Sequence, residues 1–231
     1  MSGGRGFQYE TSIYNMLMEN DLTTSKYRPA SSGHGADTAF KVKNKFYKLE
    51  VKLSLDADFG QATLRYDIDN YKWVTYSESE SMREIIDAYK VAEFAQSVWK
   101  AVPYNHFKSS EVNKRRPKRR NMSTFEESED KKNFKDAFKE LRENRVAQYY
   151  NSKDVYYIQI GYDKGFYYMG KDIANLGVPE FKPNQKIRIR RKPAGGSKYT
   201  FASAILVDKR VDRSPYNLDY NAIFLLNKNR E

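Results

Sequence analysis

The most regular pattern of apolar and polar residues lies in TAFKVKNKFYKLEVKLS, residues 38–54. Apolar side chains alternate with lysines on both sides of Asn44-Lys45, a pattern typical of a β-hairpin. If the turn holds only these two residues, Asp37 pairs with Lys52 across the hairpin. One face then points into a core and carries Phe40, Val42, Tyr47, Leu49, Val51 and Leu53.

Periodicity predicts further elements in the first half of the chain. Residues 9–20 form a short helix, because Ile13, Tyr14 and Leu17 recur on one face. A loop rich in Pro, Ser and Gly, RPASSGHGAD, separates it from the hairpin. After the hairpin, LDADFGQATLRYD contains a turn and a third strand, which is expected to continue through YKWVTY. A longer helix follows over residues 78–101, and its apolar side is formed by Ile85, Ala88, Tyr89, Ala92, Ala95 and Trp99.

The second half of the chain changes character twice. Residues 108–133 are polar and contain the basic run KRRPKRR, so a loosely ordered linker is expected there. Ser123 and Glu126 have capping-box spacing and begin a helix that extends to about residue 150. Its inward-facing residues are Phe134, Phe138 and Leu141. Two strand pairs follow, DVYYIQIGYDKGFYYMG and KIRIRRKPAGGSKYTFASAILVDK. The predicted fold class is mixed α/β.

Charge gives the first indication of function. The 231 residues include 41 Lys and Arg against 30 Asp and Glu, a net charge of +11 at pH 7. This surplus favours a polyanionic partner, most commonly nucleic acid, whereas the alternative is that the charge serves solubility alone.

Cysteine, histidine and hydropathy narrow the chemistry. The chain has no cysteine and two histidines, which excludes a thiolate site and disfavours a histidine-rich zinc site. A metal ion would therefore be a hard cation on oxygen ligands. No apolar run approaches the roughly 20 residues of a membrane span, and the N-terminus lacks a signal-peptide core. We therefore expect a cytoplasmic protein, in the host cytoplasm if the chain is phage-encoded.

Candidate chemistry lies on the polar face of the hairpin. Because strand residues alternate between faces, Asp37, Glu50 and Lys52 project to the same side. The diagonal separation of the two acids is about 7–8 Å at the backbone, so both can reach one divalent ion. Mg²⁺ lowers the pKa of a bound water and stabilises charge on a phosphoryl oxygen. Lys52 would orient or help deprotonate that water, or offset phosphorane charge. The alternative is a solvated strand face on which Asp37 only caps a turn.

An acid after a Gly-rich loop, followed by E-x-K on the next strand, resembles the PD-(D/E)xK nuclease superfamily. The residues are SSGHGAD and KLEVKLS, in the style of Holliday-junction-resolvase-like and restriction-type members. Ala36 stands where the name of the motif has Pro. The resemblance covers residues 9–75 and implies catalytic roles for Asp37, Glu50 and Lys52.

The resemblance also implies a domain organisation. Residues 1–107 would form a restriction-endonuclease-like αβββαβ core, joined by the 108–133 linker to a β-rich C-terminal extension. This last region, 134–231, would complete the core, bind DNA, or do both.

Two further site residues follow from the resemblance. Glu10, on the first helix, would be a metal ligand beside Asp37 and Glu50; otherwise it only favours the helix dipole. Gln61, after the E-x-K strand, would be a further catalytic residue.

Basic residues are candidates for contact with nucleic acid. His34 would contact a phosphate or assist catalysis, unless it is simply exposed in its Gly-rich loop. The run at 114–120 is either a DNA-tracking arm or a solvated linker, and its basic residues are Lys114, Arg115, Arg116, Lys118, Arg119 and Arg120. Arg188 and Arg190 would lie on one strand face and grasp DNA.

The sequence therefore predicts a metal-dependent DNA endonuclease that uses Mg²⁺, with Mn²⁺ able to substitute. The alternatives are a non-catalytic nucleic-acid-binding protein with a nuclease-like fold, and an RNA-cleaving nuclease. DNA is the expected partner and a membrane is not. A homodimer is expected if both strands are cut at a symmetric site.

Overall fold

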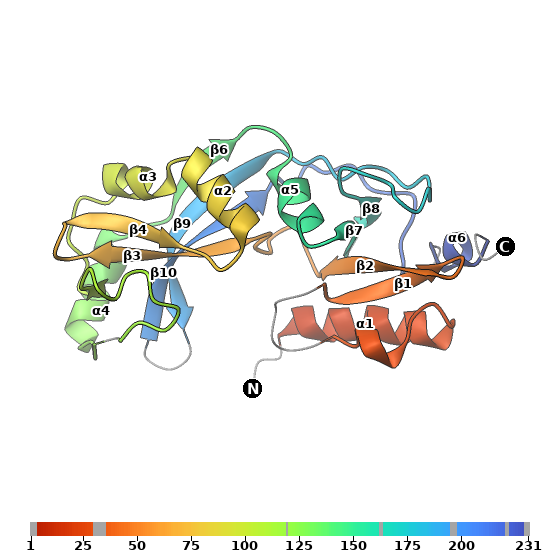
Figure 1. Cartoon of the computed structure of the whole chain (residues 1–231), viewed down its shortest axis with the longest axis horizontal. Coiled ribbons are helices and arrows are strands. Elements are labelled where there is room, and N and C mark those ends of the chain that lie inside the picture. Colours follow the sequence, from red (N-terminus) through yellow and green to blue (C-terminus); the bar gives the residue numbers. More distant parts are fainter. Residues whose placement is uncertain are drawn as a thin grey trace. The chain divides into compact units, whose positions relative to one another are not determined.

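The computed structural model describes residues 4–29, 36–118, 120–161, 164–194, 198–219 and 222–228. The chain divides into two compact units (Figure 1). Unit 1 comprises Met1–Ala57, Asn144–Asn184 and Val207–Glu231. Unit 2 comprises Asp58–Glu143 and Gln185–Leu206, so the chain leaves unit 1 and returns to it twice.

Unit 1 is a mixed α/β assembly. Its elements are α1 (Arg5–Glu19), the short helix η1 (Ser25–Tyr27), β1 (Thr38–Val42), β2 (Lys45–Lys52), α5 (Arg145–Asn151), β7 (Val155–Ile160), β8 (Gly165–Tyr168) and α6 (Ala222–Lys228). The four-stranded sheet has the order β1-β2-β7-β8. β2 and β7 are parallel, whereas the other neighbours are antiparallel. Parallel neighbours need a crossover, which here includes α5 and the first segment of unit 2.

The hairpin of β1 and β2 is confirmed, with a register that differs from the predicted one by two residues. Val42 pairs with Lys45, so the turn residues are Lys43 and Asn44. Lys43 adopts a φ of 46°, the left-handed conformation that a tight hairpin turn requires. The predicted pairing of Asp37 with Lys52 is therefore wrong. Because the difference is an even number of residues, every side chain keeps its predicted face.

The apolar face of the hairpin enters the core of unit 1, as predicted. Phe40 is fully buried, and its ring lies edge-on to the Tyr157 ring at 5.1 Å between centroids. Helix α1 covers this core with the predicted stripe of Ile13, Tyr14 and Leu17, which are all buried. The helix starts at Arg5, before the predicted position, and α6 was not predicted at all.

Unit 2 is built on a second sheet. Its elements are β3 (Gln61–Asp67), β4 (Lys72–Tyr76), α2 (Glu80–Ala88), α3 (Val91–Val98), β5 (His106–Phe107), α4 (Thr124–Asn133), β6 (Ala137–Leu141), β9 (Gln185–Ala194) and β10 (Lys198–Val207). The strand order is β4-β3-β10-β9-β6, and β5 pairs with β3. Trp73, Trp99, Phe134 and Phe201 form an aromatic core, with centroid separations of 5.0 Å for Trp73–Trp99 and Trp73–Phe201. The predicted C-terminal strand pairs are confirmed as β7–β8 and β9–β10.

Two predicted elements are interrupted in unit 2. The strand expected to run through YKWVTY is instead the antiparallel pair of β3 and β4. The Asp67 carboxylate accepts hydrogen bonds from the Asp69 and Asn70 amides, which stabilises the turn between them. The helix expected over 78–101 divides into α2 and α3 at Lys90, whose φ is 47°.

The helix expected from residue 123 to about 150 is present only at its two ends, as α4 and α5, and β6 takes the place of its middle. The Ser123–Glu126 capping box is present and begins α4, but the helix ends at Asn133. Residues of β6 pair with β9 instead, which gives their backbone groups strand partners. Phe134 is buried as predicted, whereas Phe138 is 49% exposed because alternate residues of β6 face solvent.

The basic segment before α4 packs onto unit 2. Val112 is buried, and Arg65 donates hydrogen bonds to the carbonyls of Val112 (2.6 Å) and Lys114 (2.7 Å). The expected boundaries at residues 107 and 133 therefore lie within unit 2, not between the units.

Hydropathy adds one observation about the helices. Within the described ranges, none is both long and apolar enough to cross a bilayer.

Gly165 has a backbone conformation in unit 1 that only glycine adopts readily. Its φ is 109°, and an added Cβ would lie 2.3 Å from the Tyr216 carbonyl oxygen. Gly165→Ala should therefore destabilise the protein by about 2 kcal/mol or more. Gly6, within α1, is the matched control, because an added Cβ meets nothing within 4 Å. Gly6 is the second residue of α1, so Gly6→Ala should stabilise by at most about 0.5–1 kcal/mol, the value for a helix interior. Thermal unfolding followed by circular dichroism measures both, and equal unfolding temperatures would contradict the assigned geometry.

Candidate functional site

Three elements of unit 1 bring four of the predicted site residues together. Glu10 lies on α1, Asp37 directly precedes β1, and Glu50 and Lys52 lie near the end of β2. Glu50 and Lys52 form an ion pair. The charges of both residues act on the carboxyl groups of Asp37 and Glu10. The predicted grouping of Asp37, Glu50 and Lys52 on one face is therefore present, with Glu10 beside it.

Asp37 is fixed by the backbone of the neighbouring strand. Asp37 lies one residue before Thr38, the first paired residue of β1. The Val51 amide donates a hydrogen bond of 2.8 Å to Asp37 Oδ2. This side-chain contact holds the carboxyl group next to Glu50. Burial, followed by the charge of Glu50, raises the pKa of Asp37 to about 7, although Lys52 opposes the rise. A nearby positive charge therefore stabilises the ionised form of the Asp37 carboxyl group.

Glu50 is a buried acid with a partner that the sequence did not reveal. Its exposed fraction is 5%, and Tyr150 donates a hydrogen bond of 2.9 Å to Glu50 Oε1. Burial and then the charge of Glu50 raise the pKa of Tyr150 well above its usual value, so the phenol stays a neutral donor. Tyr150 lies on α5, 100 residues away in the chain, and no local motif marks it.

Lys52 is a partly buried cation, with a side chain that is 18% exposed. Burial lowers its pKa, but the charges of Glu50 and Asp37 outweigh burial, and the net result is a pKa above the usual value. A lysine that keeps its proton cannot accept one from water. Of the predicted roles, the geometry therefore favours orienting water or offsetting charge over deprotonation.

Glu10 completes the acidic group. Burial raises its pKa above the usual value, with Lys52 opposing the rise and Glu50 adding to it. Three carboxyl groups thus share one ammonium group, and a further cation would reduce their repulsion.

The donor set fits a hard divalent ion that keeps part of its water shell. Across the described ranges, no three or more acidic or histidine side chains close around a common point at metal-binding distance. Mg²⁺ does not need such a cage, because it is often bound by one or two carboxylates and several waters. Asp37 and Glu50 can supply those two carboxylates, and Glu10 can hold a water in the outer shell.

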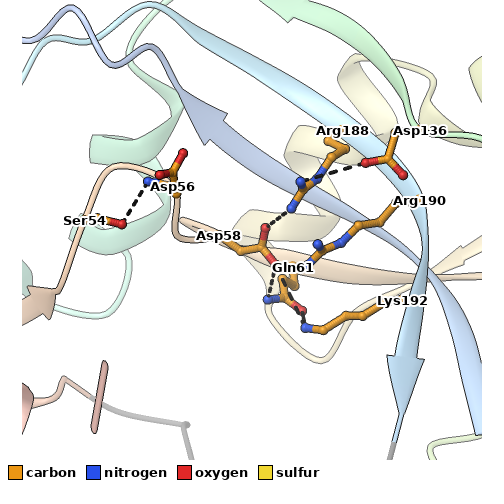
Figure 2. A network of polar contacts seen from close by, with 8 residues as sticks. All are labelled: Ser54, Asp56, Asp58, Gln61, Asp136, Arg188, Arg190 and Lys192. Carbon is orange, nitrogen blue, oxygen red and sulfur yellow. Dashed lines mark hydrogen bonds and ion pairs between the residues drawn. The ribbon is translucent and has the colours of Figure 1, made fainter. Parts of the chain in front are cut away.

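Gln61 lies in unit 2 and has partners there. Its Nε2 donates to Asp58 Oδ2 at 2.7 Å, and its Oε1 accepts from Lys192 Nζ at 2.6 Å (Figure 2). These contacts do not include the group around Glu50. The predicted catalytic role of Gln61 stays a prediction.

The predicted basic contacts fall into three classes. His34 and Arg119 lie outside the described residues. The described basic residues of the run are exposed, and three of them form ion pairs. These pairs are Lys114 with Glu111, Arg115 with Glu78 at 2.6 Å, and Arg120 with Glu126. Arg116 and Lys118 are also exposed. Arg188 and Arg190 share one face of β9, as predicted, and both contact Asp58.

Comparison with known proteins adds no further assignment. The chain matches no protein-family model, no curated protein and no solved structure.

The pKa of Asp37 predicts how stability depends on pH without metal. In the folded protein it is about 7, above the value of about 3.9 in an unfolded chain. The folded state therefore holds more protons between these values, and stability should fall as pH rises through this window. Asp37→Asn should remove part of this loss, so the variant should unfold at higher temperature than wild type near pH 8, with a smaller difference near pH 5.

Thermal unfolding in EDTA at both pH values checks this expectation. Asp56→Asn is the control, because Asp56 is an exposed acid of the same unit that pairs with Lys209 at 2.7 Å. Identical pH dependence in wild type and Asp37→Asn would show that Asp37 ionises normally.

Proposed function

We propose that this chain is a divalent-metal-dependent endonuclease that hydrolyses phosphodiester bonds in DNA. The observation that carries the proposal is the convergence of Glu10, Asp37, Glu50 and Lys52 from three elements of unit 1. Acids and a protonated lysine held at one strand end are the groups that metal-assisted phosphoryl chemistry requires.

The order of elements in unit 1 supports a restriction-endonuclease-like core. A helix is followed by the β1–β2 hairpin, then by α5 and by β7, which pairs with β2 in parallel. β2 carries the E-x-K residues, and the acid precedes β1. Among the described residues, unit 1 has one strand fewer before α5 than the expected αβββαβ core, because the expected third strand, β3, belongs to the sheet of unit 2 and lies in the long segment between β2 and α5.

The carboxyl groups define where a metal would be held. Asp37 and Glu50 would bind Mg²⁺ directly and Glu10 would act through water, with Mn²⁺ as a substitute. A bound ion would lower the pKa of water and stabilise negative charge on the phosphoryl group.

The remaining residues would act on the water and the phosphate. In hydrolysis, a water oxygen bonds to phosphorus while one P–O ester bond breaks. The water gives up one proton as its oxygen bonds to phosphorus, the leaving oxygen takes up one proton, and the products are a phosphomonoester end and a hydroxyl end. Lys52, held protonated by Glu50 and Asp37, would offset the charge that builds on the phosphoryl oxygens. Tyr150 would keep Glu50 in position through its 2.9 Å hydrogen bond.

The choice of DNA as substrate rests on charge. The net charge of +11 and the exposed residues Lys114, Arg115, Arg116, Lys118 and Arg120 favour a polyanion. RNA has the same backbone charge, and a non-catalytic binding protein would have the same surface. Activity with each substrate and metal separates these alternatives.

Incubation with supercoiled, linear, single-stranded and branched DNA, and with RNA, tests the proposal with Mg²⁺, Mn²⁺ or EDTA. Asp37→Ala and Glu50→Ala should abolish cleavage, and Lys52→Met should lower turnover by about 10²–10³-fold at saturating metal. Asp56→Ala is the control in the same unit. Metal-dependent activity within about tenfold of wild type in both acid variants would contradict the proposed site. Metal-dependent product from RNA alone would indicate an RNA-cleaving nuclease, and absence of product from every DNA and from RNA would leave a binding protein.

Tyr150 offers a sharper test, because a neighbouring tyrosine provides its control. Tyr150→Phe removes the hydrogen bond to Glu50 and should lower activity by about 10–100-fold at limiting metal. Tyr149→Phe changes the same helix, but the Tyr149 hydroxyl accepts from Lys153 instead. The measurement is cleavage rate against Mg²⁺ concentration. Equal metal dependence in the two variants would mean that Tyr150 has only a packing role.

A further inference from the structure

One carboxylate in unit 2 lies among three cations of a single strand. Asp58 accepts from Arg188 Nη2 at 2.8 Å and from Arg190 Nη2 at 2.7 Å, and Lys192 Nζ is 3.9 Å away. Figure 2 shows the three basic side chains pointing from β9 toward Asp58, with Gln61 beside it. The Asp58 side chain is 9% exposed, so most of its surface is covered.

The backbone around this cluster is well fixed. The Phe59 amide donates to the Ile205 carbonyl at 2.9 Å, and the Ile205 amide donates to the Gly60 carbonyl at 3.0 Å. These bonds tie the residues after Asp58 to β10. On the basic side, strand alternation places every second residue of β9 on the same face. The cluster is therefore built on strands, which hold a binding geometry precisely.

Short side chains on the intervening strand leave room for the arginines. β10 lies between β9 and β3, and its Ala204 pairs with Gln61 while Ala202 pairs with Thr63. Directly opposed residues share a face of the sheet, so these two methyl groups lie on the Gln61 side. The long arginine side chains of β9 can extend over these two alanines and reach Asp58.

The cluster holds more positive charge than Asp58 can balance. A second acid, Asp136, lies 3.9 Å from Arg188 and is half exposed, so its contribution is weak. Burial, opposed by Asp58 and reinforced by Arg190 and Arg188, lowers the pKa of Lys192. A nucleic-acid strand would stabilise these crowded cations, because each of its phosphates carries one negative charge and the neighbouring phosphates add to the attraction.

Both arginines also have N–H groups that Asp58 does not use as hydrogen-bond donors. Each of them contacts Asp58 through one terminal nitrogen, and the buried Nε atoms of Arg188 and Arg190 have no acceptor within the described part of the chain. A carboxylate offers two oxygens, both already used here. A phosphodiester group offers a wider set of acceptor positions and suits the planar guanidinium fork.

We propose that Arg188, Arg190 and Lys192 form a binding site for a backbone phosphate of nucleic acid, which Asp58 fills in the free protein. Asp58 is thus an internal substitute for the phosphate, and binding of nucleic acid exchanges one anion for the other. Gln61 positions both partners, since it contacts Asp58 and Lys192. The choice of nucleic acid over free phosphate rests on the proposed function.

Removing the charge of Asp58 tests the exchange directly. Asp58→Asn keeps the shape of the side chain but no longer competes with the phosphate. We expect it to bind a short labelled DNA duplex about tenfold more tightly than wild type at low salt. Glu129→Gln is the matched control, because it removes one acid of unit 2 from an exposed pair with Lys132 at 2.6 Å. It should change affinity by less than about twofold.

The measurement is fluorescence anisotropy in EDTA, so that no cleavage is required. The double variant Arg188→Gln/Arg190→Gln should weaken binding and reduce the salt slope by about one unit, because the site holds one phosphate. In that background, Asp58→Asn should no longer tighten binding. Circular dichroism checks that each variant is folded, because an unfolded chain of net charge +11 can also bind DNA, and the arginine variant keeps the test decisive if Asp58→Asn fails to fold.

Three results would overturn the proposal. They are unchanged or weaker DNA binding by folded Asp58→Asn, an equal gain in Glu129→Gln, and a wild-type salt slope in the arginine variant. Thermal stabilisation of Asp58→Asn by inorganic phosphate, at matched ionic strength and without tighter DNA binding, would instead assign the site to free phosphate. Tighter DNA binding by Asp58→Asn without any metal-dependent cleavage would retain the exchange and reject the nuclease.

Discussion

The hydrogen bond from the Val51 amide to the Asp37 carboxylate connects the fold of unit 1 to its candidate chemistry. Asp37 precedes the first paired residue of β1, so backbone pairing alone does not hold it. The contact with β2 brings its carboxyl group beside Glu50, and the same strand presents Lys52 two residues further on. A strand has a period of two, so a shift of one residue would turn this group toward the apolar core.

The charges of this group would be costly without the helices around the sheet. Glu50 is nearly inaccessible to water, and a buried carboxylate needs partners to stay ionised. Lys52 provides the charge and Tyr150 provides a neutral hydrogen bond, from β2 and α5 respectively. The helix before β7 therefore has a chemical role as well as a topological one. It lies in the connection between two parallel strands and also supports Glu50 on the first of them.

Local patterns predicted much of this arrangement, and long-range pairing explains what they missed. The hairpin faces depend only on alternation, so Asp37, Glu50 and Lys52 could be grouped although the predicted register was wrong. Tyr150 could not be found, because its partner is 100 residues distant and nothing in its surroundings is distinctive. β6 was mistaken for helix because Phe134, Phe138 and Leu141 happen to have helical spacing, whereas pairing with β9 decides the structure. The assignment of Gln61 relied on its place after the E-x-K strand, whereas its contact with Lys192 depends on the distant strand β9.

The double passage of the chain between the units has a consequence for synthesis on the ribosome. β2 must wait for β7, and the sheet of unit 2 lacks two strands until β9 and β10 emerge. At about 5–20 residues per second, the 100 residues between Glu50 and Tyr150 correspond to a delay of about 5–20 s. During this time the nascent hairpin has an unpaired edge, a feature that promotes aggregation. The lysines at positions 41, 43, 45 and 48 of the hairpin are the type of residue that protects such an edge, so their charge would serve the nascent chain before it serves the folded protein.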